Sequence, residues 1–213
     1  SFDNFHYESD RVYRFVTEQH RDAVNYVGAV PPAFGKAFRD DYTFGEYVAR
    51  TCVAEDAVIS VRGREEDQKF KEEVLFTEPE FFAIFNFPLV SGTNRLGTSN
   101  KALITEGTAK KYFGDDLAIG KTFRFDNKID FEITGVLRDP PVHSDIGGSI
   151  FVSYGNLHQY SEWYAGDDSW GGITSSIQTF TRLQKGVDPK DVERVLPDYV
   201  RKYRAESKNI HHY

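Results

Sequence analysis

Residues 101–141 constrain the fold of this chain more than any other stretch, because signals for a strand, a helix and a hairpin follow one another. An apolar run ends at Thr105, whose side-chain oxygen is suited to cap a helix over 106–113. Gly114 follows, where a glycine can adopt the left-handed conformation that ends a helix without steric cost. The stretch predicts a unit of mixed strands and helix, and it contains no catalytic motif.

A β-hairpin is predicted for the second half of the same stretch. Asp126 and Asn127 are turn formers, and they separate strands that we expect at 121–125 and 129–137. In the second strand, apolar side chains alternate with polar ones from residue 129 onward. Because alternate residues of a strand point to opposite faces, one face of this hairpin is expected to be buried and the other solvated.

The rest of the chain carries strand and helix signals in mixed order. Strands are expected at 11–18, 23–30, 46–54, 57–61, 74–76, 150–152 and 177–183, and helices at 32–39 and 189–204. We expect a strand break at residues 55–56 and a kink or early helix end at Pro197. The charged segment 62–73 is interpreted as a solvated hairpin tip, and residues 211–213 as a frayed or tag-derived end.

A capping box is predicted at residues 77–80. Thr77 as the helix cap, with Glu80 three residues later, would satisfy two backbone N–H groups at the start of a helix that carries Phe81 and Phe85. Apolar side chains cover most of the circumference of this helix, so we expect it to be buried in a core and not to form a ligand slot.

The order of these elements predicts an α+β fold with two lobes. Both ends of the chain supply strands and a helix, whereas the middle has strands and a helix of its own. We therefore expect one lobe from residues 1–98 together with 176–213, and a second lobe, 99–175, inserted into the first.

The composition excludes some classes of protein. The net charge of −7 over 213 residues argues against a nucleic-acid partner, since phosphate contacts need a basic face. No run approaches the ~18 apolar residues of a membrane span. The chain lacks Met and starts at Ser1, so we expect a processed or excised part of a longer product. Cys52 is the single cysteine, and we interpret it as a small, inert strand residue.

Motifs that would indicate catalysis or cofactor binding are missing from the sequence. There is no Gly-rich phosphate loop, and the segment 147–151 lacks the second glycine of a nucleophile elbow. His143, Ser144 and Asp145 are neighbours in sequence, but a triad needs convergence in space, so a solvated loop is the preferred interpretation. We predict no catalytic residue, no cofactor-binding residue and no cofactor.

Two further groups of residues are candidate binding sites. Acidic pairs at 115–116, 126 and 130, and 167–168 could touch a cation, but their spacing matches no calcium loop, and we interpret them as solvated turn acids. The segment 163–170 holds Trp163, Tyr164 and Trp170, which could form a surface for an apolar or sugar-like ligand. We assign no metal ligand.

Four phrases of this sequence, in this order, resemble the periplasmic core domain of MacB-like ABC transporter permeases, the family that includes FtsX- and LolC-type proteins. They are SFDNFHYESDRVYRFV at 1–16, FTEPEFFAIFNFPLVSG at 76–92, ALITEGTAKKYFGDDLAIGKTF at 102–123 and ITGVLRDPPVHSDI at 133–146. The phrases span most of residues 1–153. The run AGDDSWGGITSSIQ at 165–178 departs from the pattern, so the resemblance does not fix how the chain returns to the first lobe.

The resemblance implies a porter-like first lobe and a sabre-like inserted lobe, both on the periplasmic side of the cytoplasmic membrane. It implies a permease dimer, and ATP hydrolysis in a separate cytoplasmic ATPase domain or subunit. The nucleotide cycle would move the domain so that it exports or extracts substrate, with a periplasmic adaptor or outer-membrane channel as a further partner. The domain itself would not be an enzyme.

Two other classes of function remain open at this point. A stand-alone exported module for ligand binding or adhesion would need an exposed aromatic or apolar patch. A secreted hydrolase, the less favoured alternative, would need an acid–base pair that converges in a cleft. A permease domain instead requires that both ends of the chain leave on one side.

Overall fold

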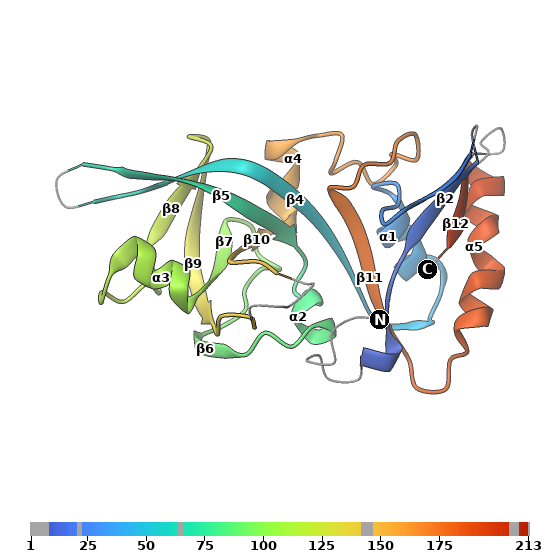
Figure 1. Ribbon diagram of the computed structural model, residues 1–213, viewed down its shortest axis with the longest axis horizontal. Coiled ribbons are helices and arrows are strands. Elements are labelled where there is room, and N and C mark those ends of the chain that lie inside the picture. The colour runs from blue at the N-terminus through green and yellow to red at the C-terminus, as the bar shows by residue number, and fades with distance from the viewer. Residues whose placement is uncertain (1–8, 21–22, 64–65, 142–146, 205–208, 213) are drawn as a thin grey trace.

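Two long strands form the framework of the molecule. A computed structural model describes residues 9–20, 23–63, 66–141, 147–204 and 209–212, and in it β4 (Gly45–Val61) pairs antiparallel with β5 (Gln68–Thr77) (Figure 1). The strand break predicted at residues 55–56 is wrong, because β4 continues through an irregularity between Ala54 and Ala57. Asp56, within this irregularity, has a φ of 56°. The irregularity is a β-bulge, which places one extra residue in β4 and bends the strand without ending it.

The other elements are arranged on both sides of this strand pair. The strands are β1 (Val12–Arg14), β2 (Val16–His20), β3 (Val24–Val27), β6 (Leu89–Gly92), β7 (Lys101–Thr105), β8 (Thr122–Phe125), β9 (Ile129–Leu137), β10 (Ile150–Ser153), β11 (Ile177–Leu183) and β12 (Asn209–His212). The helices are α1 (Phe34–Asp41), α2 (Phe81–Ile84), α3 (Glu106–Phe113), α4 (Leu157–Tyr160) and α5 (Pro189–Tyr203), with short 3-10 turns η1 (Ser9–Arg11) and η2 (Tyr154–Asn156).

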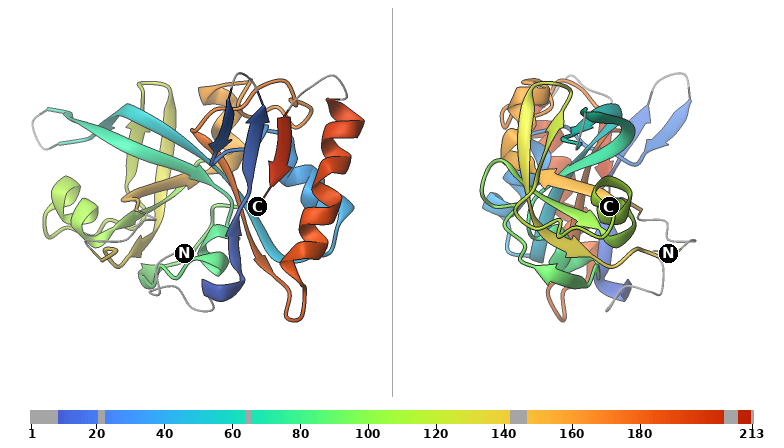
Figure 2. Two further views of the ribbon diagram at one scale, coloured as in Figure 1. Left: turned by 45° about the vertical axis from the view of Figure 1, so that its right-hand side comes forward. Right: turned by 90° about the vertical axis from the view of Figure 1, so that its left-hand side faces the viewer.

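The main sheet joins segments from the whole chain. Its strand order is β1-β11-β4-β5-β10-β7-β9-β6, and β8 pairs with both β4 and β9. A second sheet, in the order β12-β2-β3, stands beside α5 with β3 at its outer edge (Figure 2). Most strand pairs of the main sheet are antiparallel, with parallel pairing only of β10 with β5 and of β7 with β9 among the described strands, which agrees with the predicted α+β class.

The stretch 101–141 folds as its sequence predicts. Thr105 caps α3 by accepting a hydrogen bond from the backbone N of Thr108 at 3.4 Å, and Gly114 ends the helix with a φ of 63°. Asp126 and Asn127 form the hairpin turn between β8 and β9 in the left-handed region, with φ values of 46° and 55°. The residue types that tolerate this region therefore stand where the chain reverses.

One prediction about helix ends is wrong, and another is wrong in part. Thr77 does not cap α2: it is the last residue of β5, paired with Thr51, and its hydroxyl donates to the carbonyl of Arg50 at 3.1 Å. The hydroxyl of Thr77 is therefore bonded within the sheet and does not cap the helix. The early helix end at Pro197 is wrong, because α5 continues to Tyr203, whereas the kink at Pro197 stays a prediction. As the sequence predicts, Asp188 starts the helix, and its side chain accepts from the backbone N of Lys190.

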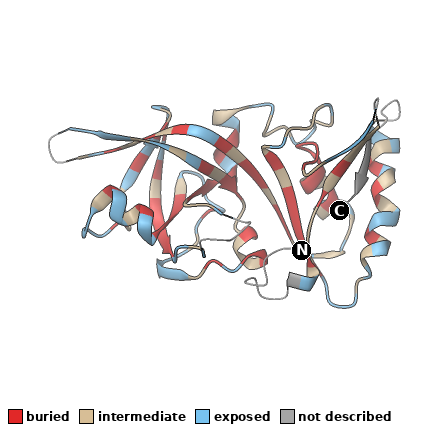
Figure 3. Cartoon of the chain, in the orientation of Figure 1, coloured by how far each residue is buried: buried red, intermediate tan, exposed pale blue. Residues whose placement is uncertain are grey.

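Among the described residues, buried apolar side chains gather in three cores. Figure 3 marks the buried residues along the chain. The porter core consists of Phe15, Val30, Phe34, Phe38, Val48, Leu183, Val192, Leu196 and Tyr199. The middle core consists of Val12, Ala49, Phe81, Ile84, Phe85, Phe87, Leu96, Leu103, Leu137, Phe151 and Phe180. The distal core consists of Cys52, Ala54, Ala57, Ile59, Val61, Val74, Phe76, Ala102, Ile104, Tyr112, Ala118, Phe123, Phe125, Ile129, Phe131, Ile133, Val136, Ile150, Val152, Tyr154, Leu157 and Ile177.

The last described strand pairs with a strand from the beginning of the chain. The last strand, β12, pairs antiparallel with β2, and His212 stands opposite Val16, near the start of the described chain (Figure 1). The frayed end predicted for residues 211–213 is therefore wrong for His211 and His212, which belong to a sheet, whereas the alternative of a tag-derived end stays a prediction. Residue 213 lies outside the described residues.

Candidate functional site

The candidate site is the point where β4 passes from the porter core to the distal core. Val48 belongs to the porter core, Ala49 to the middle core and Cys52 to the distal core, and Arg50 stands among them. The side chain of Arg50 is only 11% exposed. A guanidinium removed from water requires partners of opposite charge. We call Arg50 and the charged partners that surround it the junction, because they fix neighbouring elements to β4 between the cores.

Glu78, in the turn between β5 and α2, is the main partner of Arg50. Its carboxylate accepts from Nη2 of Arg50 at 2.8 Å, from Nε at 3.1 Å and from the backbone N of Arg50 at 3.0 Å. Arg39 on α1 donates to the same carboxylate through both Nη atoms, at 3.1 and 3.2 Å. One carboxylate thus connects α1, β4 and the end of β5 through charge-assisted hydrogen bonds.

The protonation states at this junction follow from two opposed effects. Burial on its own would raise the pKa of Glu78, but the hydrogen bonds and charges of Arg50 and Arg39 outweigh burial and leave that pKa below its ordinary value. For Arg50, burial would lower the pKa, whereas Glu78 raises it. Both groups are therefore charged near neutral pH, and the junction is a permanent ion pair.

The guanidinium of Arg50 contacts two more side chains, the half-exposed Asp167 and the buried Tyr154. Its Nη1 donates to Asp167 in the loop after α4, at 2.7 Å, and its guanidinium lies over the ring of Tyr154, 4.5 Å from the centroid. Burial raises the pKa of Tyr154, so this ring remains neutral and contributes a cation–π contact. The arrangement holds backbone elements in place, and it brings together no nucleophile and base for catalysis.

One member of each acidic pair that the sequence suggested as a cation site forms an ion pair with Lys or Arg of this chain. Asp116 pairs with Lys121 at 3.1 Å, Asp130 with Arg124 at 2.7 Å and Asp167 with Arg50. Within the described ranges, no group of three His, Cys, Asp or Glu side chains is placed to hold a metal ion. His143, Ser144 and Asp145 lie outside the described residues.

The aromatic residues of segment 163–170 do not share one surface. Tyr164 packs against the distal core, whereas Trp170 packs against the porter core and stacks on Tyr203 with 4.1 Å between the ring centroids. Trp163 is 43% exposed, and the centroid of its ring lies 5.2 Å from that of Tyr164. The single ligand surface considered from the sequence is therefore split between two parts of the molecule.

A hollow of about 400 Å³ lies beside α2. Its lining residues are Phe82, Ala83, Ile84, Asn86 and Arg182. The charged residue among them, Arg182, donates to Glu46 at 3.2 Å and to the carbonyl of Ala83 at 2.9 Å, so its charge is already matched within the chain. The hollow does not indicate a class of ligand.

Cys52 is expected to be unreactive in the folded protein. It is fully buried, and burial raises the pKa of its thiol to about 12, so almost no thiolate exists at neutral pH. We expect no reaction with Ellman's reagent in native buffer and one reactive thiol per chain in denaturant. Fast reaction under native conditions would contradict this expectation and would show that β4 opens away from the distal core.

Sequence reasoning did not identify the junction formed by Arg39, Arg50 and Glu78. A signal was present, because Arg50 falls in phase with Val48 and Cys52 on an apolar strand. A charged residue on the buried face of a strand implies a buried counter-ion elsewhere in the chain. The sequence did not reveal that Glu78 was this counter-ion.

No helix among the described residues is long and apolar enough to cross a membrane. A family model, the MacB-like periplasmic core domain, matches residues 4–199. No curated protein matches the chain in sequence.

Solved structures share the fold. A domain of a protein described as a permease, from Porphyromonas gingivalis, aligns with a TM-score of 0.77 at 20% identity, over 100% of this chain and 90% of that chain. The periplasmic region of MacB from Actinobacillus actinomycetemcomitans aligns with a TM-score of 0.64 at 13% identity, over 94% of this chain and 87% of that one. The extracellular domain of the noncanonic ABC-type transporter YknZ from Gram-positive bacteria aligns with a TM-score of 0.60 at 15% identity, over 94% of this chain and 98% of that one. These likenesses confirm the predicted α+β fold with porter-like and sabre-like lobes.

Proposed function

Because the chain belongs to the family of MacB-like periplasmic core domains, we propose that it transmits movement within an ABC transporter permease. The domain is not a catalytic one. A separate cytoplasmic ATPase domain or subunit hydrolyses ATP, and the membrane helices of the permease pass the resulting movement to this domain. The domain then exports or extracts a substrate on the outer side of the cytoplasmic membrane.

The observation that carries this proposal is the family match over residues 4–199. The positions of the described ends support it, since β12 pairs with β2 and a domain anchored at both ends must return the chain to one side. The buried junction of Arg50 and Glu78 supports it too, because a part that transmits force needs a rigid connection where β4 passes from the porter core to the distal core.

The partners and the lobes belong to the same proposal. We expect the permease to act as a dimer with its ATPase, and a periplasmic adaptor or outer-membrane channel to complete the pathway. The lobe division into 1–98 with 176–213, and 99–175, stays a prediction. In the structure, β4 and β5 contribute to the distal core from within the first of these ranges.

The sequence of the parent gene on both sides of this chain tests the proposal. We expect an apolar segment of ~20 residues before the domain and further such segments after it, as membrane anchoring requires. A cleavable signal before the domain and a stop codon soon after it would overturn the proposal. The chain would then be a free exported protein, for which binding or adhesion would be the better assignment.

A further inference from the structure

The segment between α4 and β11 passes from the distal core to the porter core. Tyr164 and Ala165, near its start, pack against the distal core. Trp170, five residues after Ala165, packs against the porter core. A segment of this length spans at most ~20 Å even when extended, so the separation of its two attachment points is limited by its covalent length.

We call the elements around the porter core the porter part and those around the distal core the distal part. The segment is attached to the porter part by three contacts. The ring of Trp170 stacks on Tyr203 of α5 with 4.1 Å between centroids and 7° between planes. The carbonyl of Trp170 accepts from Nη1 of Arg204 at 2.9 Å, and the carbonyl of Ser169 accepts from the backbone N of Ala33 at 3.2 Å. The segment is thus fixed to the end of α5 and to the turn before α1.

The segment is attached to the distal part through contacts between aromatic rings. Tyr164 lies 6.1 Å from Tyr160, which in turn stacks on Phe76 of the distal core at 5.5 Å. Trp163 also holds the segment in a defined shape, because its ring lies against Gly172, where an added Cβ would come within 2.3 Å of the ring. The segment is a packed structure between two cores.

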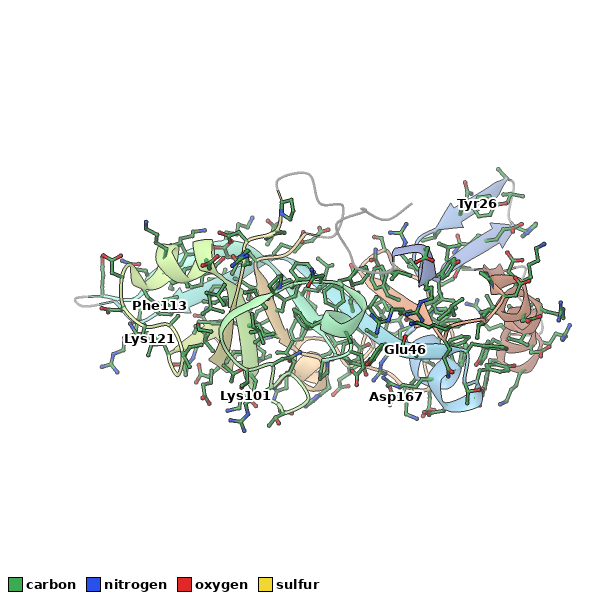
Figure 4. The ribbon with its side chains drawn as sticks, turned by 90° about the horizontal axis from the view of Figure 1, so that it is seen from below. Tyr26, Glu46, Lys101, Phe113, Lys121 and Asp167 are labelled. Carbon is green, nitrogen blue, oxygen red and sulfur yellow. The ribbon has the colours of Figure 1, made fainter. Side chains whose placement is uncertain are left out.

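Between these attachments, Asp167 bonds to the junction itself. Figure 4 shows Asp167 between the two halves of the molecule, away from the labelled Lys101 and Phe113 of the distal part. Arg50 uses Nε and Nη2 for Glu78 and Nη1 for Asp167. The side chain of Glu78 is 12% exposed, whereas that of Asp167 is 50% exposed. Water can therefore replace Asp167 far more easily than Glu78, and Arg50 stays in place when it does.

We propose that residues 161–172 form a strap that limits the angle between the porter and distal parts, and that the Asp167–Arg50 pair is its latch. Glu78 keeps Arg50 in position in both states, so the latch can open and close again without rearrangement of the junction. Opening separates Asp167 from Arg50 and Trp170 from Tyr203, after which the bulged strand β4 can bend. The use of this movement in transport rests on the proposed function, whereas the restraint is a property of this chain alone.

Distance measurements between the two parts test the strap. Spin labels would be attached at Lys128→Cys, in the exposed β8–β9 turn, and Glu193→Cys, on the exposed side of α5. The single natural cysteine, Cys52, is buried, so it need not be replaced. In the strap variant, with Asp167→Asn and Trp170→Ala, we expect the distance distribution to broaden and its mean to shift by about 2–5 Å, the scale of repacking movements between rigid parts.

A matched control separates the latch from a general loss of charge. Asp116→Asn removes an exposed carboxylate whose partner, Lys121, lies in the same distal part, and it should leave the distribution unchanged. A distribution that is unchanged in the strap variant, or equally broadened by Asp116→Asn, would overturn the proposal. This test is independent of the flanking gene sequence, so the strap and the proposed function can fail separately.

The single variant Asp167→Asn guards against unfolding, since it alters only a half-exposed side chain. It should broaden the distribution less than the double variant, and circular dichroism should show an unchanged fold. At ~1 M salt the Debye length is about 3 Å, so the latch should be screened. The distance distribution of the wild type should then broaden as much as that of Asp167→Asn at low salt, and the distribution of Asp167→Asn should not broaden further. Absence of broadening both in this variant and in high salt would exclude the latch.

Discussion

Glu78→Ala should lower the free energy of unfolding by about 3–5 kcal/mol, the usual cost of removing one partner from a buried ion pair. The side chains of Arg50 and Glu78 are 11% and 12% exposed. Without Glu78, Arg50 would lose its principal counter-ion, the backbone N of Arg50 would lose its acceptor, and the guanidinium of Arg39 would lose its carboxylate partner. Urea denaturation followed by circular dichroism would measure the change.

Glu132→Ala is the matched control for this substitution. Glu132 also forms an ion pair, with Lys101, but its side chain is 41% exposed. An ion pair that is accessible to water contributes at most about 1 kcal/mol, so the control should lose little stability. If Glu78→Ala lost no more than Glu132→Ala, the junction would not be the rigid connection that we describe.

The pH dependence of stability gives a second measure of the same junction. The pKa of Glu78 in the folded protein lies below its ordinary value of 4.5, since Arg50 and Arg39 outweigh the effect of burial. A lowered folded pKa contributes stability that is present above the unfolded pKa and is lost as the pH falls through the folded one. The wild type should therefore lose stability below about pH 4.5, and Glu78→Ala should show less of this loss.

The sequence was sufficient to predict the parts of the fold that depend on local signals. Thr105, Gly114 and the pair Asp126–Asn127 acted as predicted, because caps and turns are decided by a few neighbouring residues. Thr77 shows where such reasoning fails. The same residue could cap a helix or end a strand, and the choice was made by its pairing with Thr51, a contact distant in sequence.

The junction and the strap could not be predicted from the sequence for a related reason. Asp167 is 117 residues from Arg50, and no local pattern links them. The aromatic residues of segment 163–170 suggested a shared surface, but Trp170 and Tyr164 belong to different cores. The run that did not follow the family pattern, 165–178, contains most of the strap, so the part of the sequence that resemblance explained least is the part that connects the distal core to the porter core.

Gly35→Val should also lower the free energy of unfolding, by about 3 kcal/mol, because α1 packs so closely on the sheet that a side chain at this position has no space. A Cβ at Gly35 would lie 2.6 Å from Cγ of Arg50 and 2.8 Å from Oγ1 of Thr179. The helix would have to move away from β4 and β11, and Arg50 would be displaced from Glu78.

Two further substitutions decide whether this loss comes from the close approach. In an unobstructed helix, Gly→Ala stabilises by about 1 kcal/mol, so a clash at Gly35 should make Gly35→Ala destabilising despite the better helix propensity. Gly147→Val is the control for bulk, since nothing lies within 4 Å of a Cβ there, and it should change stability little. A stabilised Gly35→Ala protein would contradict the tight packing of α1. The expected loss would show instead that the contact between α1 and β4 helps to keep Arg50 at the junction.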